Sequence, residues 1–208
     1  MTATDLTLTE GVDGLGIALA PAQTEQLDQY LDLLEKWNRV YNLTAIRDRV
    51  QMVTHHVLDS LAVVPHVRGP RVLDVGSGGG MPGIPIAIAR PDLRVTLLDS
   101  NHKKTAFLNQ AVASLRLPNV AVAAERIESW TTAERFETIV SRAFADLAEF
   151  VAVGARLLAD GGVFAAMKGV HPYEEIDRLP AGFAVREVVR LHVPGLDAER
   201  HLVLVGRA

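Results

Sequence analysis

An acid and a run of glycines follow the first apolar segment of the chain that could form a strand. Residues 71–75 are mostly hydrophobic, and Gly76, Ser77 and residues 78–80 come directly after them. Glycine lets the backbone turn sharply and approach a ligand closely, and a helix that begins near Pro82 would point its positive N-terminal dipole at the same place. The pattern predicts a loop that binds a nucleoside cofactor.

Two classes of cofactor fit this loop. Gly78, Gly80 and Gly83 have the spacing of the dinucleotide fingerprint, in which a pyrophosphate lies on the helix N-terminus. Asp74 favours the other class, because a carboxylate at the rim would repel a pyrophosphate but would pair with the cationic amino acid end of S-adenosylmethionine. We therefore favour S-adenosylmethionine over a nicotinamide or flavin.

The next apolar segment, residues 95–99, also ends in an acid. Asp99 stands at the distance of about 20 residues at which a carboxylate binds ribose hydroxyls in such folds. The alternative is that Asp99 caps the following helix, although Ser100 or Asn101 could cap it equally well. Because two acids end two successive strands, the sequence favours ribose recognition by Asp99.

Composition limits the possible functions. The chain has 208 residues, 49% of them hydrophobic and 22% charged, which is enough for one substantial core. It contains no Cys, which excludes disulfides, thiolate metal sites and Cys nucleophiles. The seven His show no ligand spacing, so we expect no metal site. The sequence shows no leader and no apolar run of membrane-spanning length, so we expect a cytoplasmic protein that binds no membrane.

The distribution of charge limits where RNA could bind. The formal net charge of −4 argues against indiscriminate binding of nucleic acid. Acids are in excess up to Asp99, whereas basic and acidic residues balance beyond it. A surface that binds RNA phosphates should therefore be local and come mainly from the second half of the chain, with Arg47 and Arg49 added.

The hydrophobic pattern divides the chain into two regions. Residues 24–67 carry apolar side chains at helical spacing and predict helices, whereas residues 1–20 are small and polar and should be loosely structured. We place an N-terminal helical extension at residues 1–67, packed on a single compact domain at residues 68–208.

Strand and helix patterns alternate from residue 71 onward. Strands are predicted near residues 71–75, 95–99, 120–124, 138–142, 163–167, 185–193 and 201–205. The pattern indicates an α/β fold with a mostly parallel sheet. Residues 194–197 would join the last two strands as a hairpin, which places one antiparallel strand at the end of the chain. Ligands bind beyond the carboxyl ends of the strands in such sheets.

Chemically active residues follow the later strands as well. Ile127, between acids after the third strand, is suited to packing against an adenine whose amino hydrogens those acids accept. Arg142 follows the fourth strand and Lys168 the fifth. These cations have two possible roles: structural ion pairs with Asp74 and Asp99, or contacts with the cofactor carboxylate or RNA phosphate.

Residues that the sequence lacks limit the kinds of methylation that this protein could catalyse. Methylation at carbon 5 of a pyrimidine commonly uses a Cys nucleophile, and there is none. Methylation of an exocyclic amine usually shows Asn or Asp before Pro-Pro and an aromatic residue after the fourth strand, where residues 141–144 read SRAF instead. Guanine N7 carries a free lone pair, so its methylation needs alignment with the methyl group rather than a general base.

Six segments in this order closely resemble one family, the bacterial guanine-N7 methyltransferases of small-subunit ribosomal RNA, also called the glucose-inhibited division protein B family. The segments are WNRVYNLTAIRD at 37–48, HVLDSL at 56–61, GSGGGMPGIP at 76–85, SRAF at 141–144, KG at 168–169 and ERHL at 199–202. The resemblance runs from about residue 24 to the end of the chain.

The resemblance implies a class I, Rossmann-like methyltransferase fold and transfer of a methyl group from S-adenosylmethionine to N7 of one guanine in the decoding-region loop of 16S rRNA. Its partner would be 16S rRNA or the small ribosomal subunit. With the residues argued above, we expect cofactor contacts from Asp74, Gly76, Ser77, Gly78, Met81, Asp99, Ile127, Glu128 and Arg142. We expect catalytic roles for Arg142, Lys168 and Arg200, and RNA contacts from Arg47, Lys168, Arg200 and His201.

Several alternatives stay open. His55, His56 and Asp59 could face the cofactor from one helix, or could serve in helix capping or in hydrogen bonds between helices. Phe144 could stack on the target guanine or pack in the core, and Arg200 and His201 could form a surface pair with Glu199. Two other functions are a nicotinamide-dependent oxidoreductase and a non-catalytic RNA-binding factor in ribosome assembly.

Overall fold

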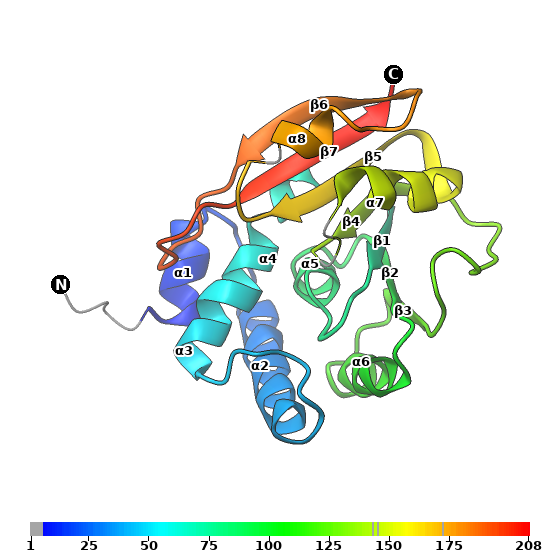
Figure 1. Cartoon of the computed structure of the whole chain (residues 1–208). Helices are drawn as coiled ribbons and strands as arrows, with labels where there is room; N and C mark the ends of the chain where they lie inside the picture. The colour runs from blue at the N-terminus through cyan, green and yellow to red at the C-terminus, as the bar shows by residue number, and fades with distance from the viewer. Residues whose placement is uncertain (1–5, 143, 145, 172) are drawn as a thin grey trace.

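A seven-stranded sheet forms the centre of the computed structural model, which describes residues 6–142, 144, 146–171 and 173–208 (Figure 1). The strands are β1 (Arg71–Val75), β2 (Arg94–Leu98), β3 (Val120–Ala123), β4 (Phe136–Ser141), β5 (Leu158–Lys168), β6 (Phe183–Arg190) and β7 (His201–Arg207). Their order in the sheet is β3-β2-β1-β4-β5-β7-β6.

The first five strands run parallel to one another, and β7 runs antiparallel to both β5 and β6. The predicted α/β fold, with a mostly parallel sheet and an antiparallel terminal strand, is confirmed. Apolar side chains on both faces of β1, including Val72 and Leu73, are fully buried, as expected for a central parallel strand. The carboxyl ends of β1 to β5 consequently meet at one edge.

Helices cover both faces of the sheet. They are α5 (Gly83–Ala89), α6 (His102–Ser114), α7 (Leu147–Gly154), the 3₁₀ turn η3 (Ala155–Leu157) and α8 (Tyr173–Ile176). Ile84 of α5 and Phe107 of α6 belong to one buried cluster. Phe150 of α7 belongs to a second cluster, with Phe164 of β5. Each face of the sheet therefore has its own core.

The N-terminal extension is helical and packs on the first of these cores. It consists of α1 (Leu8–Gly14), α2 (Pro21–Tyr41), α3 (Arg49–Met52), the π-helix η1 (Val53–Leu58), α4 (Asp59–Leu61) and the 3₁₀ turn η2 (Val64–His66). Leu27 and Leu34 of α2 are fully buried in the same cluster as Ile84. Helices predicted over residues 24–67 are confirmed. The boundary between residues 67 and 68 stays a prediction, because one core includes residues from both sides of it.

The expectation that residues 1–20 are loosely structured is wrong for α1. Thr7 and Glu10 form a capping box, in which the Glu10 amide donates to Thr7 Oγ1 at 3.3 Å and the Thr7 amide donates to the Glu10 carboxylate at 3.0 Å. Leu8 and Val12 are buried against the core. Tertiary packing thus stabilises a helix too short to be stable alone. Residues 1–5 lie outside the described part of the chain.

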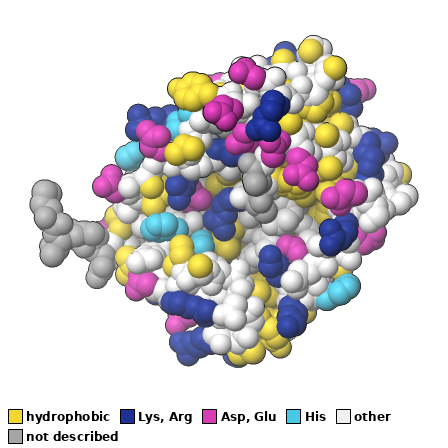
Figure 2. Space-filling view, in the orientation of Figure 1, with side chains coloured by type: hydrophobic (Ala, Val, Ile, Leu, Met, Phe, Trp, Pro, Cys, Tyr) yellow, Lys and Arg dark blue, Asp and Glu magenta, His cyan; other side chains and the backbone are white. Residues whose placement is uncertain are grey.

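The surface carries mixed charge. Figure 2 shows Lys and Arg side chains interspersed with Asp and Glu on the face in view, without one continuous basic region. Among the described residues, none of the helices combines the length and the apolar character needed to span a bilayer.

Candidate active site

The glycine loop follows β1 and is anchored to the end of β2. The amides of Gly76 and Ser77 donate to the Leu98 carbonyl at 2.8 and 3.2 Å, and the Gly80 amide donates to the Ser77 carbonyl at 2.7 Å. Gly76 and Gly78 have φ angles of 71° and 57°, a left-handed conformation that favours glycine. The loop is therefore folded by its own backbone bonds into a turn that opens toward the carboxyl edge of the sheet.

Asp74 lies beneath this loop. Its side chain is fully buried, and Oδ2 accepts a hydrogen bond of 2.9 Å from the Gly83 amide at the start of α5. Oδ1 is buried with no hydrogen-bond partner in the described structure. Burial raises the pKa of the Asp74 carboxyl to about 7, against the opposing effect of the Gly83 and Ser77 hydrogen bonds. A nearby cation would favour the ionised form, which fits the positively charged cofactor that the sequence predicts.

Asp99 ties the end of β2 to the glycine loop. Its Oδ2 accepts from the Gly78 amide at 2.9 Å and its Oδ1 from the Asn101 amide at 2.8 Å. Asn101, not Asp99, caps α6, because its side chain accepts from the Lys103 and Lys104 amides. The capping alternative for Asp99 is therefore wrong. Each carboxylate oxygen keeps a second lone pair, so the ribose contact stays a prediction that this geometry permits.

Two pockets meet at Gly76. The first, of about 270 Å³, is lined by Val75, Gly76, Leu98, Asp99, Ser100, Lys104, Glu125, Arg126, Ile127, Glu128 and Phe144. The second, of about 210 Å³, is lined by Leu43, Thr44, Gly76, Ser77, Gly78, Gly79, Met81 and Arg142. The first pocket contains the residues expected to bind the nucleoside of the cofactor, and the second contains those expected around its amino acid end. A ligand with both parts would pass over Gly76.

Arg142 stands in the second pocket and reaches back to the N-terminal extension. Its guanidinium lies 3.0 Å from the His55 carbonyl, 3.4 Å from Met81 Sδ and 3.5 Å from Asp59 Oδ2. The ion pair with Asp74 or Asp99, left open by the sequence, is therefore replaced by one with Asp59. Arg142 joins the cofactor loop to the helical extension.

Lys168 also has a different partner from those considered. Its ammonium lies 2.7 Å from Glu175 of α8 and 3.3 Å from the Phe144 carbonyl, and the side chain is only 11% exposed. Glu175 accepts a second bond from the Leu147 amide at the start of α7. Lys168 thus helps to hold α7 and α8 together at the carboxyl edge.

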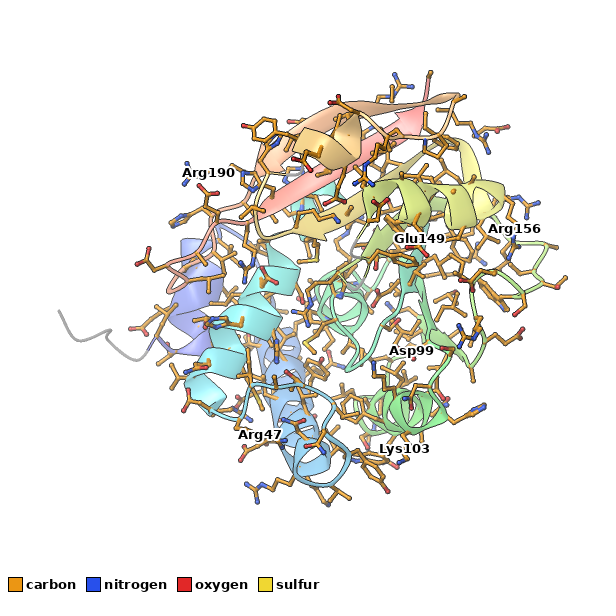
Figure 3. The ribbon with its side chains drawn as sticks, viewed as in Figure 1. Arg47, Asp99, Lys103, Glu149, Arg156 and Arg190 are labelled. Atoms are coloured by element: carbon orange, nitrogen blue, oxygen red, sulfur yellow. The ribbon has the colours of Figure 1, made fainter. Side chains whose placement is uncertain are left out.

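Of the remaining predicted RNA contacts, Arg200 and His201 are neighbours in the chain, whereas Arg47 lies in the loop between α2 and α3. Arg200 donates to Asp59 Oδ1 at 3.0 Å, so its carboxylate partner is Asp59, and Glu199 is instead 3.8 Å from Arg190. His201 is buried in β7 opposite Lys168 of β5. Arg47 lies beyond the end of α2, far from Arg190 in Figure 3, and donates to the Asn38 carbonyl at 2.6 Å. All of these RNA contacts stay predictions.

Phe144, which lines the first pocket, also packs against the core. Its ring centroid lies 5.1 Å from that of Phe150. This contact supports the core-packing alternative, whereas stacking on a target guanine stays untested.

His55 and His56 of η1 form hydrogen bonds with different neighbours. His56 is buried, its Nε2 lies 2.9 Å from Thr44 Oγ1, and burial lowers its pKa to about 4. His55 offers its backbone carbonyl to Arg142. Helices of the π type leave carbonyls displaced from the regular ladder and are frequent at functional sites. His56 thus contacts the loop between α2 and α3 rather than another helix, while Asp59 faces the arginines of the site.

Three residues of this region escaped the sequence analysis as site residues. Leu43 and Thr44 line the second pocket, and Tyr30 donates a hydrogen bond of 2.5 Å to the Gly79 carbonyl. Leu43 and Thr44 lie in a segment that resembles the methyltransferase family, whereas Tyr30 lies outside those segments. Asp59, which the sequence left open as a residue that could face the cofactor, pairs with both arginines. The N-terminal extension therefore contributes residues to the site.

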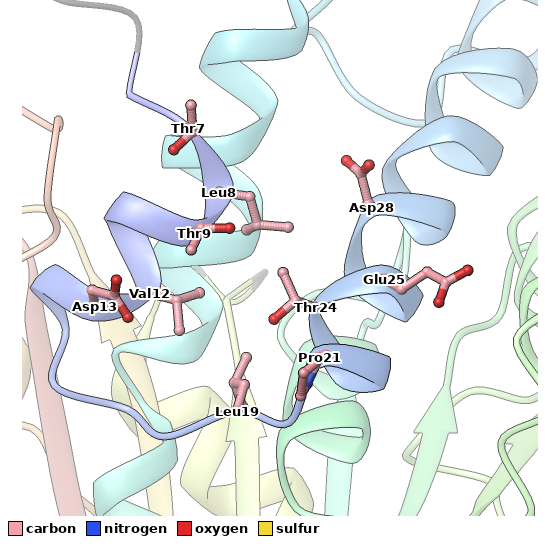
Figure 4. Close-up of a pocket in the computed structure, with 10 residues that line it drawn as sticks. All are labelled: Thr7, Leu8, Thr9, Val12, Asp13, Leu19, Pro21, Thr24, Glu25 and Asp28. Carbon is pink, nitrogen blue, oxygen red and sulfur yellow. The ribbon is translucent and has the colours of Figure 1, made fainter.

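A wider cavity of about 680 Å³ lies elsewhere, between α1 and α2 (Figure 4). It is lined by Thr7, Leu8, Thr9, Val12, Asp13, Leu19, Pro21, Thr24, Glu25 and Asp28, none of which belongs to the glycine loop. Within the described parts of the chain, no three or more His, Asp or Glu side chains gather as a metal site would require.

Known proteins with similar sequences point to one family. A family model described as rRNA small subunit methyltransferase G matches residues 23–203. The ribosomal RNA small subunit methyltransferase G of Laribacter hongkongensis is 59% identical over 199 residues, which cover 96% of each chain. That of Chromobacterium violaceum is 58% identical over 204 residues, 98% of each chain. That of Neisseria meningitidis is 53% identical over 201 residues, 96% of this chain and 97% of the relative.

Solved structures share the fold at low sequence identity. The O-methyltransferase TomG from Streptomyces achromogenes, in complex with S-adenosylmethionine, has a TM-score of 0.63 at 14% identity and covers 96% of each chain. The glycopeptide N-methyltransferase MtfA, with S-adenosylhomocysteine, has a TM-score of 0.63 at 13% identity and covers 74% of this chain and 87% of its own. The predicted class I methyltransferase fold is confirmed. By its sequence over nearly its whole length, the chain belongs to the rRNA small subunit methyltransferase G family.

Proposed function

We propose that this protein transfers a methyl group from S-adenosylmethionine to N7 of one guanine in the decoding-region loop of 16S rRNA. The observation that carries the proposal is the pair of pockets that meet at Gly76, with Arg142 at one of them, in a chain 59% identical to a ribosomal RNA small subunit methyltransferase. The substrate is 16S rRNA, free or within the small ribosomal subunit.

The residues present fit the cofactor. Asp99 and Ile127 line the pocket for the nucleoside, and the left-handed turn at Gly78 leaves space beside its Cα. The buried oxygen of Asp74 that has no hydrogen-bond partner in the described structure supplies negative charge beneath the amino acid end of the cofactor. When bound, the cofactor supplies an electrophilic methyl group. The loop and Arg142 hold the reacting groups in line, a proximity effect worth about 7 kcal/mol or more in favourable cases.

The two rival functions are weaker on physical grounds. A pyrophosphate over the loop would lie close to Asp74, an acid that opposes its charge. A non-catalytic assembly factor would have no use for Arg142 beside Met81 in the second pocket.

Transfer of labelled methyl groups tests the proposal. We expect the protein with labelled S-adenosylmethionine to modify small-subunit rRNA from cells that lack this methylation, and to be protected from thermal unfolding by S-adenosylhomocysteine and not by NAD. Protection without any transfer would favour the assembly factor, and protection by NAD alone would favour the oxidoreductase.

The rate of methyl transfer should be nearly independent of pH between about 6 and 9. The guanine N7 lone pair is unprotonated in this range, so no residue accepts a proton before transfer, and His56, with its pKa lowered to about 4 by burial, stays neutral throughout. Single-turnover methylation with both substrates saturating measures this step. A tenfold rise with one apparent pKa near 7 would contradict the mechanism and direct attention first to Asp74, whose pKa burial raises to about 7.

Lys168→Ala should weaken rRNA binding and flatten its dependence on salt, if Lys168 exchanges Glu175 for a phosphate when RNA binds. Filter binding between about 50 and 200 mM salt would show a slope lower by about one ion. Affinity for S-adenosylhomocysteine should change little. An unchanged slope in a folded variant would leave Lys168 with only its structural contacts to α8.

A further inference from the structure

One buried carboxylate lies between the two arginines of the site. Asp59 Oδ1 lies 3.0 Å from Arg200 Nε, and Oδ2 lies 3.5 Å from Arg142 Nη1. The Asp59 side chain is 2% exposed, whereas those of Arg142 and Arg200 are 28% and 23% exposed. The carboxylate is therefore enclosed, while both guanidinium groups extend to where a ligand could reach them.

The three residues come from three separate parts of the fold. Asp59 begins α4 of the N-terminal extension, Arg142 follows β4, and Arg200 directly precedes β7. Asp59 is thus the point at which the extension meets the carboxyl edge of the sheet.

A buried ion pair is a poor source of stability, because the cost of removing charges from water consumes most of the attraction. Burial raises the pKa of the Asp59 carboxyl, and the two guanidinium groups oppose that rise. The arrangement instead restricts the orientation of the two guanidinium groups. Arg200 donates a hydrogen bond of 3.0 Å to Oδ1, and the charge at Oδ2 draws Arg142 toward it at 3.5 Å, while the His55 carbonyl accepts from the same guanidinium.

The orientation matters most at Arg142. Its other contacts are a backbone carbonyl, that of His55, and the sulfur of Met81, which lines the second pocket with it. Neither contact carries a formal charge, so Asp59 is the charged group among the partners that direct this side chain. Loss of the Asp59 charge would leave Arg142 free to adopt other rotamers in the partly exposed pocket.

We propose that Asp59 is a positioning residue, which orients Arg142 at the cofactor pocket and Arg200 at its rim through one shared carboxylate. The proposal rests on the methyltransferase function proposed above. It assigns to the N-terminal extension a part in the methyl-transfer step, because the extension supplies the anion that both arginines need.

Asp59→Asn is nearly isosteric and removes the charge. We expect the single-turnover rate, per site that binds S-adenosylhomocysteine and with both substrates saturating, to fall about tenfold to a hundredfold. The rate of the Asp59→Glu variant, which keeps the charge but displaces it, should fall less. Asp92→Asn is the matched control, because it breaks the exposed pair between Asp92 and Arg90 and should keep the rate of the natural protein.

A double-mutant cycle separates positioning from a merely structural role. In an Arg142→Ala background, Asp59→Asn should lower the rate by a clearly smaller factor than in the natural protein, because one of the two groups that it orients is already gone and only Arg200 remains. A structural role would instead lower the melting temperature and the number of binding sites, and leave the rate per site unchanged.

Three results would overturn the proposal. The first is a folded Asp59→Asn protein with the natural rate per site, and the second is a double variant in which the two losses of rate multiply fully. Where Asp59→Asn does not fold, the third is a folded Asp59→Glu protein with the natural rate. If the natural protein itself transfers no methyl group while Asp92→Asn and the natural protein both bind S-adenosylhomocysteine, the proposed function fails first, so the two failures are distinguishable.

Discussion

Gly78→Val is expected to weaken binding of S-adenosylhomocysteine by about a hundredfold or more, equivalent to about 2.7 kcal/mol. A Cβ at position 78 would have no protein atom nearer than the Gly76 carbonyl at 3.7 Å, so the added side chain does not collide with the fold. It would instead occupy space at the second pocket, which Gly78 lines together with Gly76 and where we expect the amino acid end of the cofactor. Isothermal titration of the folded variant measures the loss.

The strain of a side chain at positive φ needs its own control. Gly16, with a φ of 67° and no atom within 4 Å of a built Cβ, lies between α1 and α2, away from the loop. Gly16→Val should cost a similar amount of stability, about 1 to 2 kcal/mol, and leave cofactor affinity unchanged. If a folded Gly78→Val protein bound the cofactor as tightly as Gly16→Val, the assignment of the loop would be wrong.

Arg142→Ala is expected to lower the single-turnover rate of methyl transfer by about a hundredfold, and to weaken binding of either substrate much less. The substitution removes the contacts with Met81 and His55 and leaves Asp59 paired with Arg200 alone. Because a buried carboxylate loses one of its two cations, the melting temperature should fall as well.

Arg90→Ala provides the comparison for Arg142→Ala. Arg90 pairs with Asp92 on the surface after α5, so its removal should change neither the rate nor the affinities measurably. Equal rates for Arg142→Ala and the natural protein, with cofactor and rRNA both saturating, would remove Arg142 from the catalytic residues.

The loop and the strand ends were predictable because their signals are local. Charged residues at or just after the ends of apolar strands lie at the carboxyl edge in any parallel sheet, so Asp74, Asp99 and Arg142 could be placed together before the structure was known. Their partners could not be predicted. The Lys168 partner Glu175 belongs to a helix of only four residues, which is too short to give a periodic pattern.

Asp59 shows the limit of reading one segment at a time. A single Asp within a helical pattern usually lies on a solvated face, and nothing local indicates that residues 83 and 141 positions later in the chain bring two arginines to it. The helix α1 was missed for a similar reason, because its stability comes from Leu8 and Val12 against a core formed by later residues. Such contacts depend on tertiary packing, which local propensity does not contain.

Mapping of the methylated nucleotide tests the central proposal most directly. N7-methylguanine is cationic, and the RNA chain next to it can be cleaved after reduction and aniline treatment, so primer extension on treated rRNA locates it. We predict that small-subunit rRNA from a strain without this gene shows no such cleavage in the decoding-region loop, and that the purified protein with S-adenosylmethionine restores it at one guanine. Cleavage that persists without the gene, or a methyl group restored at another atom or base, would contradict the proposed function.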